Sequence, residues 1–360
     1  MNAFLSTFTP SLMPHDTLEA ILVQRHELVG RIVDLVRESA TGGSKHHTLL
    51  IGPRGIGKTH IVSLVYHRVQ AIDELQDRLL IAWLREEEWG ISTLRDLLIR
   101  ILLTLAEEYS DPELRRRVDE LYQHDPDAAE RLAGGLLRKH VAGRTVLVLA
   151  ENLGDMFAGL GEEGQQRLRA YIQGNPFFTI LATAQSLFGG IQQQTSPFYG
   201  FFRIYHLEEL TLEEARELLG KVARLDEDEE LSSFIRTPTG RARIRAVHHL
   251  GGGNHRVYVI FSQFLTRKTL DELVEAVMQM IEKLTPYYQS RMSRLSQQQR
   301  KIVEHLCDRR GAAPVKDIAQ RCFATSQAVS STLKDLRGMG YVRSTPHGRE
   351  SYYELREPLM

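Results

Sequence analysis

Short runs of hydrophobic residues alternate with segments of helical periodicity through the first part of the chain. The runs are continuous rather than alternating in hydrophobicity, which is typical of parallel strands covered on both faces. The segments between them carry apolar residues three and four positions apart, as amphipathic helices do. This order predicts a parallel sheet with helices on both faces, an α/β fold. The predicted strands are 48–51, 79–84, 146–150, 177–183 and 202–205, and the clearest helices are 18–37, 60–70 and 93–109.

The alternation stops after residue 211, and 212–295 shows helical patterns only. The last segment differs again: three helices are expected at 296–306, 314–321 and 325–337, followed by strands at 341–343 and 352–355. Three helices and a hairpin predict a winged helix. We therefore expect three domains, with an α/β core at 1–207, a helical lid at 208–290 and a winged helix-turn-helix at 291–360.

A glycine-rich loop joins the first predicted strand to the helix after it. Residues 52–59 read Gly-Pro-Arg-Gly-Ile-Gly-Lys-Thr, which matches G-x-x-x-x-G-K-[ST] between strand and helix. The glycines let successive N–H groups point at a phosphate beside the positive end of the helix dipole. Lys58 supplies a cation to the β- and γ-phosphates and Thr59 a hydroxyl to Mg²⁺. We expect ATP and Mg²⁺ to bind here, with the nucleotide held by Gly52, Pro53, Arg54, Gly55, Ile56, Gly57, Lys58, Thr59 and His60.

The end of the third predicted strand should carry acidic residues that hold Mg²⁺ and orient water. The sequence there is Ala150-Glu151-Asn152, with Asp155 one helical turn later. In one register Glu151 is a metal ligand beside Thr59 and Asn152 replaces a catalytic glutamate. In the other, Ala150 replaces the metal ligand and Glu151 polarises water. Either register lacks one carboxylate of the pair, so we expect slow hydrolysis.

Two further residues lie where they could contact the γ-phosphate. Thr183 ends the fourth strand and could bond to the phosphate or to the attacking water, although a β-branched residue also suits a strand end. Arg256 follows Gly251-Gly252-Gly253-Asn254-His255 and opens an apolar helix. A cation in the first turn of a helix does not compensate the dipole, which favours a role facing an anion.

These elements together resemble the AAA+ ATPases, in the branch of the archaeal replication initiators and the STAND-like switch ATPases. The resemblance covers about residues 15–285 and rests on the P-loop, the acidic strand end, Thr183 and the Gly-Gly-Gly-Asn-His-Arg segment. It implies that Val23 and Arg25 border the adenine and that Thr183 and Arg256 occupy the two sensor positions. The C-terminal segment resembles the MarR-like DNA-binding domains.

Composition adds few constraints. The net charge of −1 argues against a polyanion-binding surface over the whole molecule. The two cysteines, Cys307 and Cys322, indicate neither a disulfide framework nor a zinc site. The chain shows no signal peptide and no membrane span, so we expect a cytoplasmic protein without a membrane partner.

Basic residues exceed acidic ones near the C-terminus, where 11 Lys and Arg face seven Asp and Glu from Ser296 onward. This excess favours double-stranded DNA as the partner of the winged helix. The third helix would enter the major groove and the wing would contact phosphates. The expected contacts are Gln327, Ser330, Ser331 and Lys334 on the helix, and Arg343, His347 and Arg349 on the wing.

The sequence as a whole predicts an ATPase in which nucleotide state controls DNA binding by the winged helix, with nucleotide-dependent self-assembly as a further expectation. The alternative is a signalling or scaffold ATPase whose winged helix binds a protein partner. A ligand-responsive transcription regulator is a third interpretation.

Overall fold

The structure is a computed structural model that describes residues 10–85, 90–309, 311–347 and 350–357. The chain forms two compact units. One unit comprises Arg25–Gly52 and Lys58–Leu207 and is called the sheet unit below. The other comprises residues up to Gln24, Pro53–Gly57 and the chain from Glu208 onward, and is called the C-terminal unit. The short segment Pro53–Gly57 is the centre of the glycine-rich loop, and it packs with the C-terminal unit.

The sheet unit contains a parallel sheet of five strands in the order β2-β3-β4-β1-β5. All five predicted strands are confirmed to within one residue at either end. Every residue of β2 and β3 is buried, which explains their uninterrupted hydrophobicity. Because all five strands run parallel, their carboxyl ends lie at the same edge of the sheet. The strands are β1 (His47–Ile51), β2 (Leu79–Leu84), β3 (Thr145–Ala150), β4 (Phe178–Ala184) and β5 (Arg203–His206).

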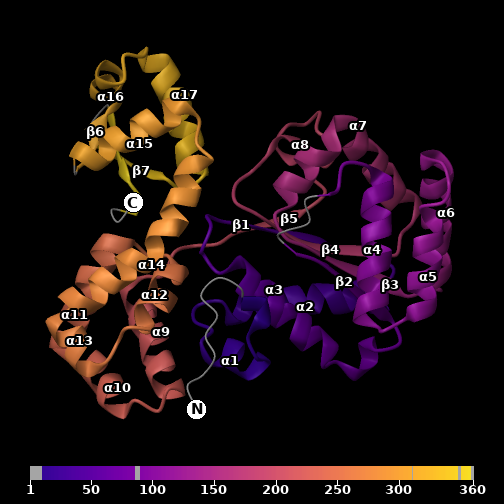
Figure 1. The fold of residues 1–360 in the computed structure, drawn as a ribbon, viewed down its shortest axis with the longest axis horizontal. Coiled ribbons are helices and arrows are strands. Elements are labelled where there is room, and N and C mark those ends of the chain that lie inside the picture. Colours follow the sequence, from indigo (N-terminus) through magenta and orange to yellow (C-terminus); the bar gives the residue numbers. More distant parts are fainter. Residues whose placement is uncertain (1–9, 86–89, 310, 348–349, 358–360) are drawn as a thin grey trace. The chain divides into compact units, whose positions relative to one another are not determined.

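Helices cover this sheet, as the strand patterns predict (Figure 1). Four of them, α5 to α8, are absent from the sequence-based prediction. Both α5 and α6 begin with an Asp-Pro pair whose aspartate caps the helix, at Asp111 and Asp125, so a start signal was present for these two. The helices are α2 (His26–Thr41), α3 (Lys58–Gln70), α4 (Leu94–Glu108), α5 (Pro112–Leu121), α6 (Pro126–Val141), α7 (Leu153–Gly174) and α8 (Gly189–Gln192), with a 3₁₀ turn at Asp73–Leu75.

The single helix expected over 18–37 is wrong. The structure has α1 (His15–Ala20) and α2 separated by a break at 21–25. Gln24 adopts a φ of 68°, in the left-handed region, which a continuous right-handed helix excludes. The segment before the break belongs to the C-terminal unit, together with a 3₁₀ turn at Pro10–Leu12.

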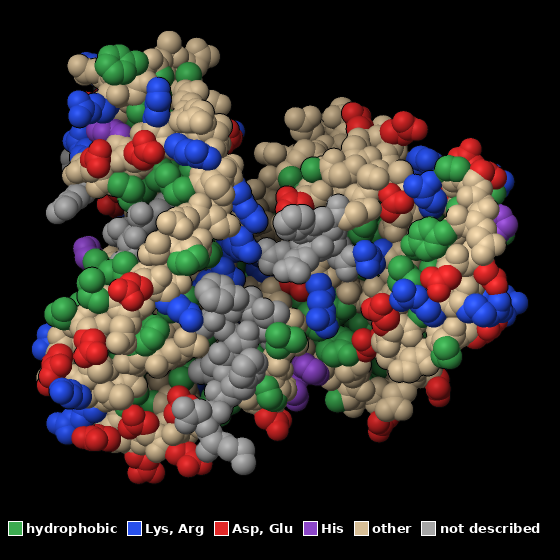
Figure 2. Space-filling view, viewed as in Figure 1, with side chains coloured by type: hydrophobic (Ala, Val, Ile, Leu, Met, Phe, Trp, Pro, Cys, Tyr) green, Lys and Arg blue, Asp and Glu red, His purple; other side chains and the backbone are tan. Residues whose placement is uncertain are grey.

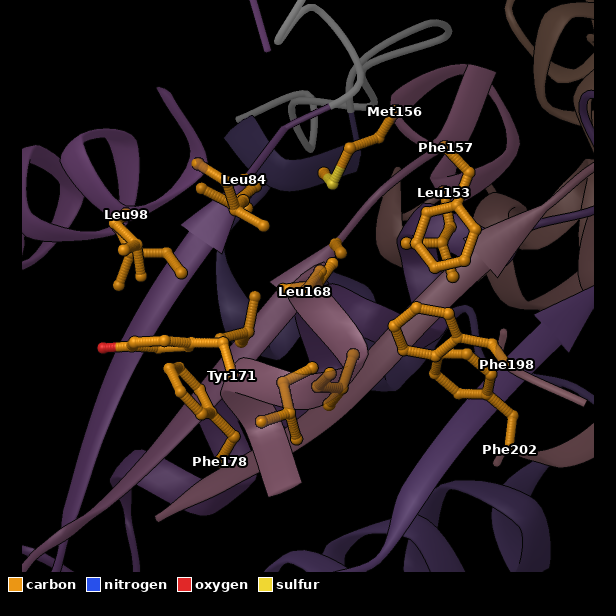
Figure 3. A pocket seen from close by; sticks show the side chains of 16 residues that line it. Leu84, Leu98, Leu153, Met156, Phe157, Leu168, Tyr171, Phe178, Phe198 and Phe202 are labelled. Atoms are coloured by element: carbon orange, nitrogen blue, oxygen red, sulfur yellow. The ribbon is translucent and has the colours of Figure 1, made fainter. Parts of the chain in front are cut away.

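The core of the sheet unit contains a small apolar cavity of about 30 Å³ (Figure 3). Its walls come from strands β2 to β4, from helices α4 and α7 and from the segment between α8 and β5, and include Leu84, Leu98, Leu168, Phe178 and Phe198. A space of this size holds about one water molecule, and apolar walls offer that water no partner, so such cavities stay dry. We interpret it as a packing space and not as a ligand site.

The C-terminal unit is helical up to the winged helix, as predicted. Its helices are α9 (Leu212–Leu225), α10 (Glu229–Arg236), α11 (Pro238–Gly251), α12 (His255–Ser262), α13 (Arg267–Glu272) and α14 (Val274–Ser293). The helical region and the winged helix share one unit, and α14 continues through residue 290. The division of this unit at 290 stays a prediction.

The winged helix has the predicted order of elements. Ser296 and Gln299 form the expected capping box at its start, with reciprocal hydrogen bonds of 2.9 and 3.3 Å. A two-residue strand, β6, was too short to predict; it completes an antiparallel sheet in the order β6-β8-β7. The elements are α15 (Gln297–Arg309), β6 (Ala313–Pro314), α16 (Val315–Arg321), α17 (Ser326–Gly338), β7 (Val342–His347) and β8 (Glu350–Leu355). No helix within the described ranges is long and apolar enough to cross a bilayer.

Candidate nucleotide site and winged-helix surface

The glycine-rich loop connects β1 to α3, and two of its glycines need their conformational freedom. Gly55 and Gly57 have φ values of 84° and 93°, which side chains disfavour. The loop begins where the N–H of Gly52 donates to the carbonyl of Ala184 in β4, over 3.2 Å. It ends at Lys58, whose Nζ donates to the carbonyl of Gly52 over 2.6 Å. The lysine side chain therefore folds back over the loop that it follows.

Glu151 follows β3 directly and is 7% exposed. The hydroxyl of Thr59, in the first turn of α3, donates to its Oε2. Its Oε1 accepts from the indole Nε1 of Trp83 in β2, over 2.9 Å. The structure thus brings together the two predicted metal ligands. Sequence reasoning did not single out Trp83, although a tryptophan near the end of a neighbouring strand was a usable signal.

Asn152 adopts a φ of 56° and precedes α7. Its backbone N–H donates to Oγ1 of Thr183 over 3.0 Å, and its side-chain amide donates to Asp155. Thr183 is 2% exposed and is the second-last residue of β4. Asn152 and Thr183 are therefore neighbours at the carboxyl edge of the sheet, one residue beyond the carboxylate that contacts Thr59.

Arg256 lies in the first turn of α12, in the same unit as loop residues 53–57. Its backbone N–H donates to the carbonyl of Gly55 over 3.1 Å. Its guanidinium carbon lies 4.9 Å from the ring centre of Tyr287, a cation–π distance. The structure therefore places the predicted lid arginine beside the glycine-rich loop.

The residues expected to border the adenine fall in different units. Val23 is 2% exposed and belongs to the C-terminal unit, where Lys221 of α9 donates to the carbonyl of the preceding Leu22. Arg25 is 6% exposed, belongs to the sheet unit and precedes α2. His60 is half-buried in the first turn of α3. The expectation that Val23 and Arg25 both contact the adenine therefore stays a prediction.

The predicted DNA-contacting residues of α17 are all exposed: Gln327, Ser330, Ser331 and Lys334. On the wing, Arg343 is exposed and donates to Glu354 over 2.8 Å. The side chain of His347 and the whole of Arg349 lie outside the described residues. Figure 2 shows acidic side chains among the basic ones on the visible face of this domain. The basic excess of this segment is therefore partly compensated locally.

The comparisons with known proteins bear on the fold. No protein-family model matches the chain. An uncharacterised HTH-type transcriptional regulator of Methanocaldococcus jannaschii is 20% identical, over 92% of this chain and 87% of its own. The ORC2 protein of Aeropyrum pernix, in a structure of ADPNP and ADP complexes, superposes with a TM-score of 0.64 at 14% identity, over 94% of this chain and 91% of its own. The chain has the fold of the archaeal ORC proteins.

Two further structures agree with this assignment of the fold. A Walker-type ATPase of Pyrococcus abyssi gives a TM-score of 0.62 at 15% identity, over 94% of each chain. The ORC1 protein of Aeropyrum pernix, solved in complex with DNA, gives 0.51 at 14% identity, over 96% of this chain and 92% of its own. These superpositions span the sheet unit, the helical region and the winged helix, because each covers at least 94% of this chain. At these identities the likeness concerns the fold alone.

Proposed function

We propose that the protein is a switch ATPase that binds ATP with Mg²⁺ at the glycine-rich loop and couples nucleotide state to DNA binding by its winged helix. The observation that carries the proposal is the Thr59–Glu151 pair at the carboxyl edge of the sheet, beside the loop. Hydroxyl and carboxylate oxygens are ligands that Mg²⁺ prefers. No group of three or more His, Cys, Asp or Glu side chains that could hold a metal occurs among the described residues. Two protein ligands suit a cation that arrives with phosphates and water.

The first register of the strand end fits this geometry. Glu151 contacts Thr59, so it serves as the acidic metal ligand, while Asn152 stands where a general base would be. An amide cannot accept a proton from water at neutral pH, whereas a carboxylate can. When bound, Mg²⁺ neutralises charge on the β- and γ-phosphates. We therefore expect hydrolysis to be slow, with Asn152 and Thr183 orienting water and Arg256 contacting the γ-phosphate.

DNA binding is the proposed output. Exposed polar side chains on α17, including Gln327 and Ser331, suit a helix that reads base edges. The wing residues Arg343, His347 and Arg349 are proposed to contact phosphates.

A protein partner is the second candidate for the winged helix. Phe323 is 97% exposed in the turn before α17. Its φ of 52° holds it in the left-handed region. A fully exposed aromatic residue is more typical of protein-binding surfaces than of phosphate contacts.

Calorimetric titration with ATP and with ADP tests the nucleotide site. Replacing Lys58 with alanine should weaken binding at least tenfold, about 1.4 kcal/mol, because it removes the cation of the loop. Lys268→Ala, which changes an exposed lysine of α13, is the matched control. Unchanged affinity in folded Lys58→Ala protein would contradict the site.

Light scattering with and without ATP tests nucleotide-dependent assembly.

A further inference from the structure

A buried acidic side chain follows the last strand of the winged helix. Glu357 lies two residues after β8 and is 0% exposed. Its Oε1 accepts from Nη1 of Arg291 over 2.9 Å and from Nδ2 of Asn254 over 3.1 Å. Its Oε2 accepts from the hydroxyl of Tyr288 over 2.9 Å. Both carboxylate oxygens are therefore bound by side chains of the helical region.

The same asparagine also bonds to the glycine-rich loop. Nδ2 of Asn254 donates to the carbonyl of Arg54 over 3.1 Å, and this carbonyl accepts a second bond of 2.9 Å from the hydroxyl of Tyr287. Asn254 is 0% exposed and its Oδ1 caps α12 through the N–H of Arg256. One amide group thus joins the loop to Glu357, with one hydrogen directed to each.

The winged helix also touches the loop directly. Gly340 lies between α17 and β7 with a φ of 78°, and a Cβ there would approach Cβ of Pro53 to 2.7 Å. The carbonyl of Gly340 accepts from Nη2 of Arg291 over 3.2 Å, and the hydroxyl of Tyr341 donates to the carbonyl of Arg291 over 2.9 Å. Arg291 therefore bonds to the Gly340 carbonyl and to the Tyr341 hydroxyl of the winged helix as well as to Glu357.

Burial makes these bonds interdependent. Arg291 and Glu357 are 4% and 0% exposed, and a buried ion pair that loses one partner leaves an uncompensated charge. Moving the winged helix away from the helical region would break the pair and free Asn254 from one of its acceptors. Reshaping the loop around Arg54 would withdraw the other acceptor. Each event therefore changes the free energy of the other, and such coupling is reciprocal.

We propose that Glu357 is a latch: a positioning residue through which the winged helix, by way of Asn254, holds the glycine-rich loop in one conformation. The proposal rests on the proposed function in assigning nucleotide phosphates to this loop. Its consequence is that nucleotide binding to the loop and displacement of the winged helix influence one another. Glu357 contacts no nucleotide itself and acts through Asn254.

Hydrogen exchange of nucleotide-free full-length protein tests the latch without relying on ligand binding. Glu357→Gln should speed exchange in peptides covering residues 52–59, because a neutral amide cannot form an ion pair with Arg291 and has only one acceptor oxygen. Glu354→Gln is the matched control, since Glu354 lies on the same winged helix and pairs with the exposed Arg343 over 2.8 Å. Faster loop exchange in the first variant only would support the latch. Equal loop exchange in both variants would overturn it.

A gentler variant covers the case in which Glu357→Gln melts the winged helix. Tyr288→Phe removes one hydrogen bond from Glu357 and leaves Arg291 and Asn254 in place. Its loop peptides should exchange faster than those of wild type, and no change would again overturn the latch.

Nucleotide affinity separates this inference from the proposed function. If wild type binds ATP, Glu357→Gln should change the ATP affinity at least fivefold, the lower end of typical coupling between sites. If Glu357→Gln binds ATP as tightly as wild type, the latch is contradicted and the proposed function is unaffected. If wild type does not bind ATP but Glu357→Gln still shows faster loop exchange, the proposed function is contradicted and the latch is supported.

Discussion

The indole Nε1 of Trp83 donates a 2.9 Å hydrogen bond to Oε1 of Glu151, which leaves Oε2 of the same carboxylate facing the hydroxyl of Thr59. Trp83 is 8% exposed and its ring packs at 5.1 Å from that of Tyr66. The tryptophan therefore fixes the direction of the carboxylate proposed to hold the metal.

Trp83→Phe should lower the rate of ATP hydrolysis about tenfold while leaving ATP affinity nearly unchanged, because residues that orient metal ligands typically contribute ten- to a hundredfold. Glu151→Gln should remove hydrolysis altogether. Glu108→Gln is the control, since Glu108 accepts from Tyr66 and lies at the end of α4. Phosphate release measured under single-turnover conditions checks the order of the three rates. Normal hydrolysis by Glu151→Gln would contradict the assignment of Glu151 as the metal ligand.

Arg256→Met should leave ATP binding partly intact but abolish any difference between the ATP- and ADP-bound forms in protease sensitivity. The reason is that Arg256 adjoins the loop through Gly55 and is proposed to contact the γ-phosphate. Arg267→Met, which changes an exposed arginine paired with Glu230 over 2.7 Å, serves as the comparison. If Arg256→Met keeps the wild-type difference, this arginine is structural.

Neutralising Arg343 and Arg349 together should weaken DNA binding for all sequences. The log–log salt dependence should flatten by about one to two units, at roughly 0.9 per phosphate contact. Changing Gln327 and Ser331 should instead alter sequence preference, because base edges carry the sequence information. Fluorescence anisotropy against salt, with and without nucleotide, separates the two effects. If the wild-type protein shows no DNA affinity at low salt, DNA binding is contradicted and the winged helix is a protein-binding module.

Acid should destabilise the sheet unit through His47. Burial, and secondarily the charges of Arg169 and His46, lower the pKa of this imidazole from 6.5 to about 4. Between these values the unfolded chain binds the proton and the folded protein does not, so the free energy of unfolding falls as pH drops from about 6.5 to about 4. The full effect is about 3 kcal/mol.

The ring of His47 stacks on Phe201 at 4.0 Å, so His47→Phe keeps an aromatic ring while removing the titration. Urea unfolding of this variant should show a flatter pH dependence in that window. An unchanged slope would mean that other groups control the acid response.

Local patterns predicted much of this fold. The five strands, the glycine-rich loop and the order of elements in the winged helix follow from the spacing of hydrophobic residues and from turn residues. Both signals depend only on residues a few positions apart in the sequence. The break at Gln24 was missed because a single left-handed residue leaves the apolar periodicity on either side intact. At the candidate site, Thr59 and Glu151 were both expected as Mg²⁺ ligands, from the loop motif and from the acidic residue at the end of the third strand. Trp83 and Glu357 were not identified, since their partners lie 68 and 66 to 103 residues away along the chain.

The assignment of residues 53–57 to the C-terminal unit limits how this protein can be dissected. A fragment ending at Leu207 would retain Lys58, Thr59 and Glu151 but would lose the bonds from Asn254 and Tyr287 to Arg54. For the same reason, a chimera that takes its helical region and winged helix from a relative would place that relative's side chains, in place of Asn254 and Tyr287, against this loop. Transplantation would need to carry the loop centre and the segment up to Gln24 along with the C-terminal half.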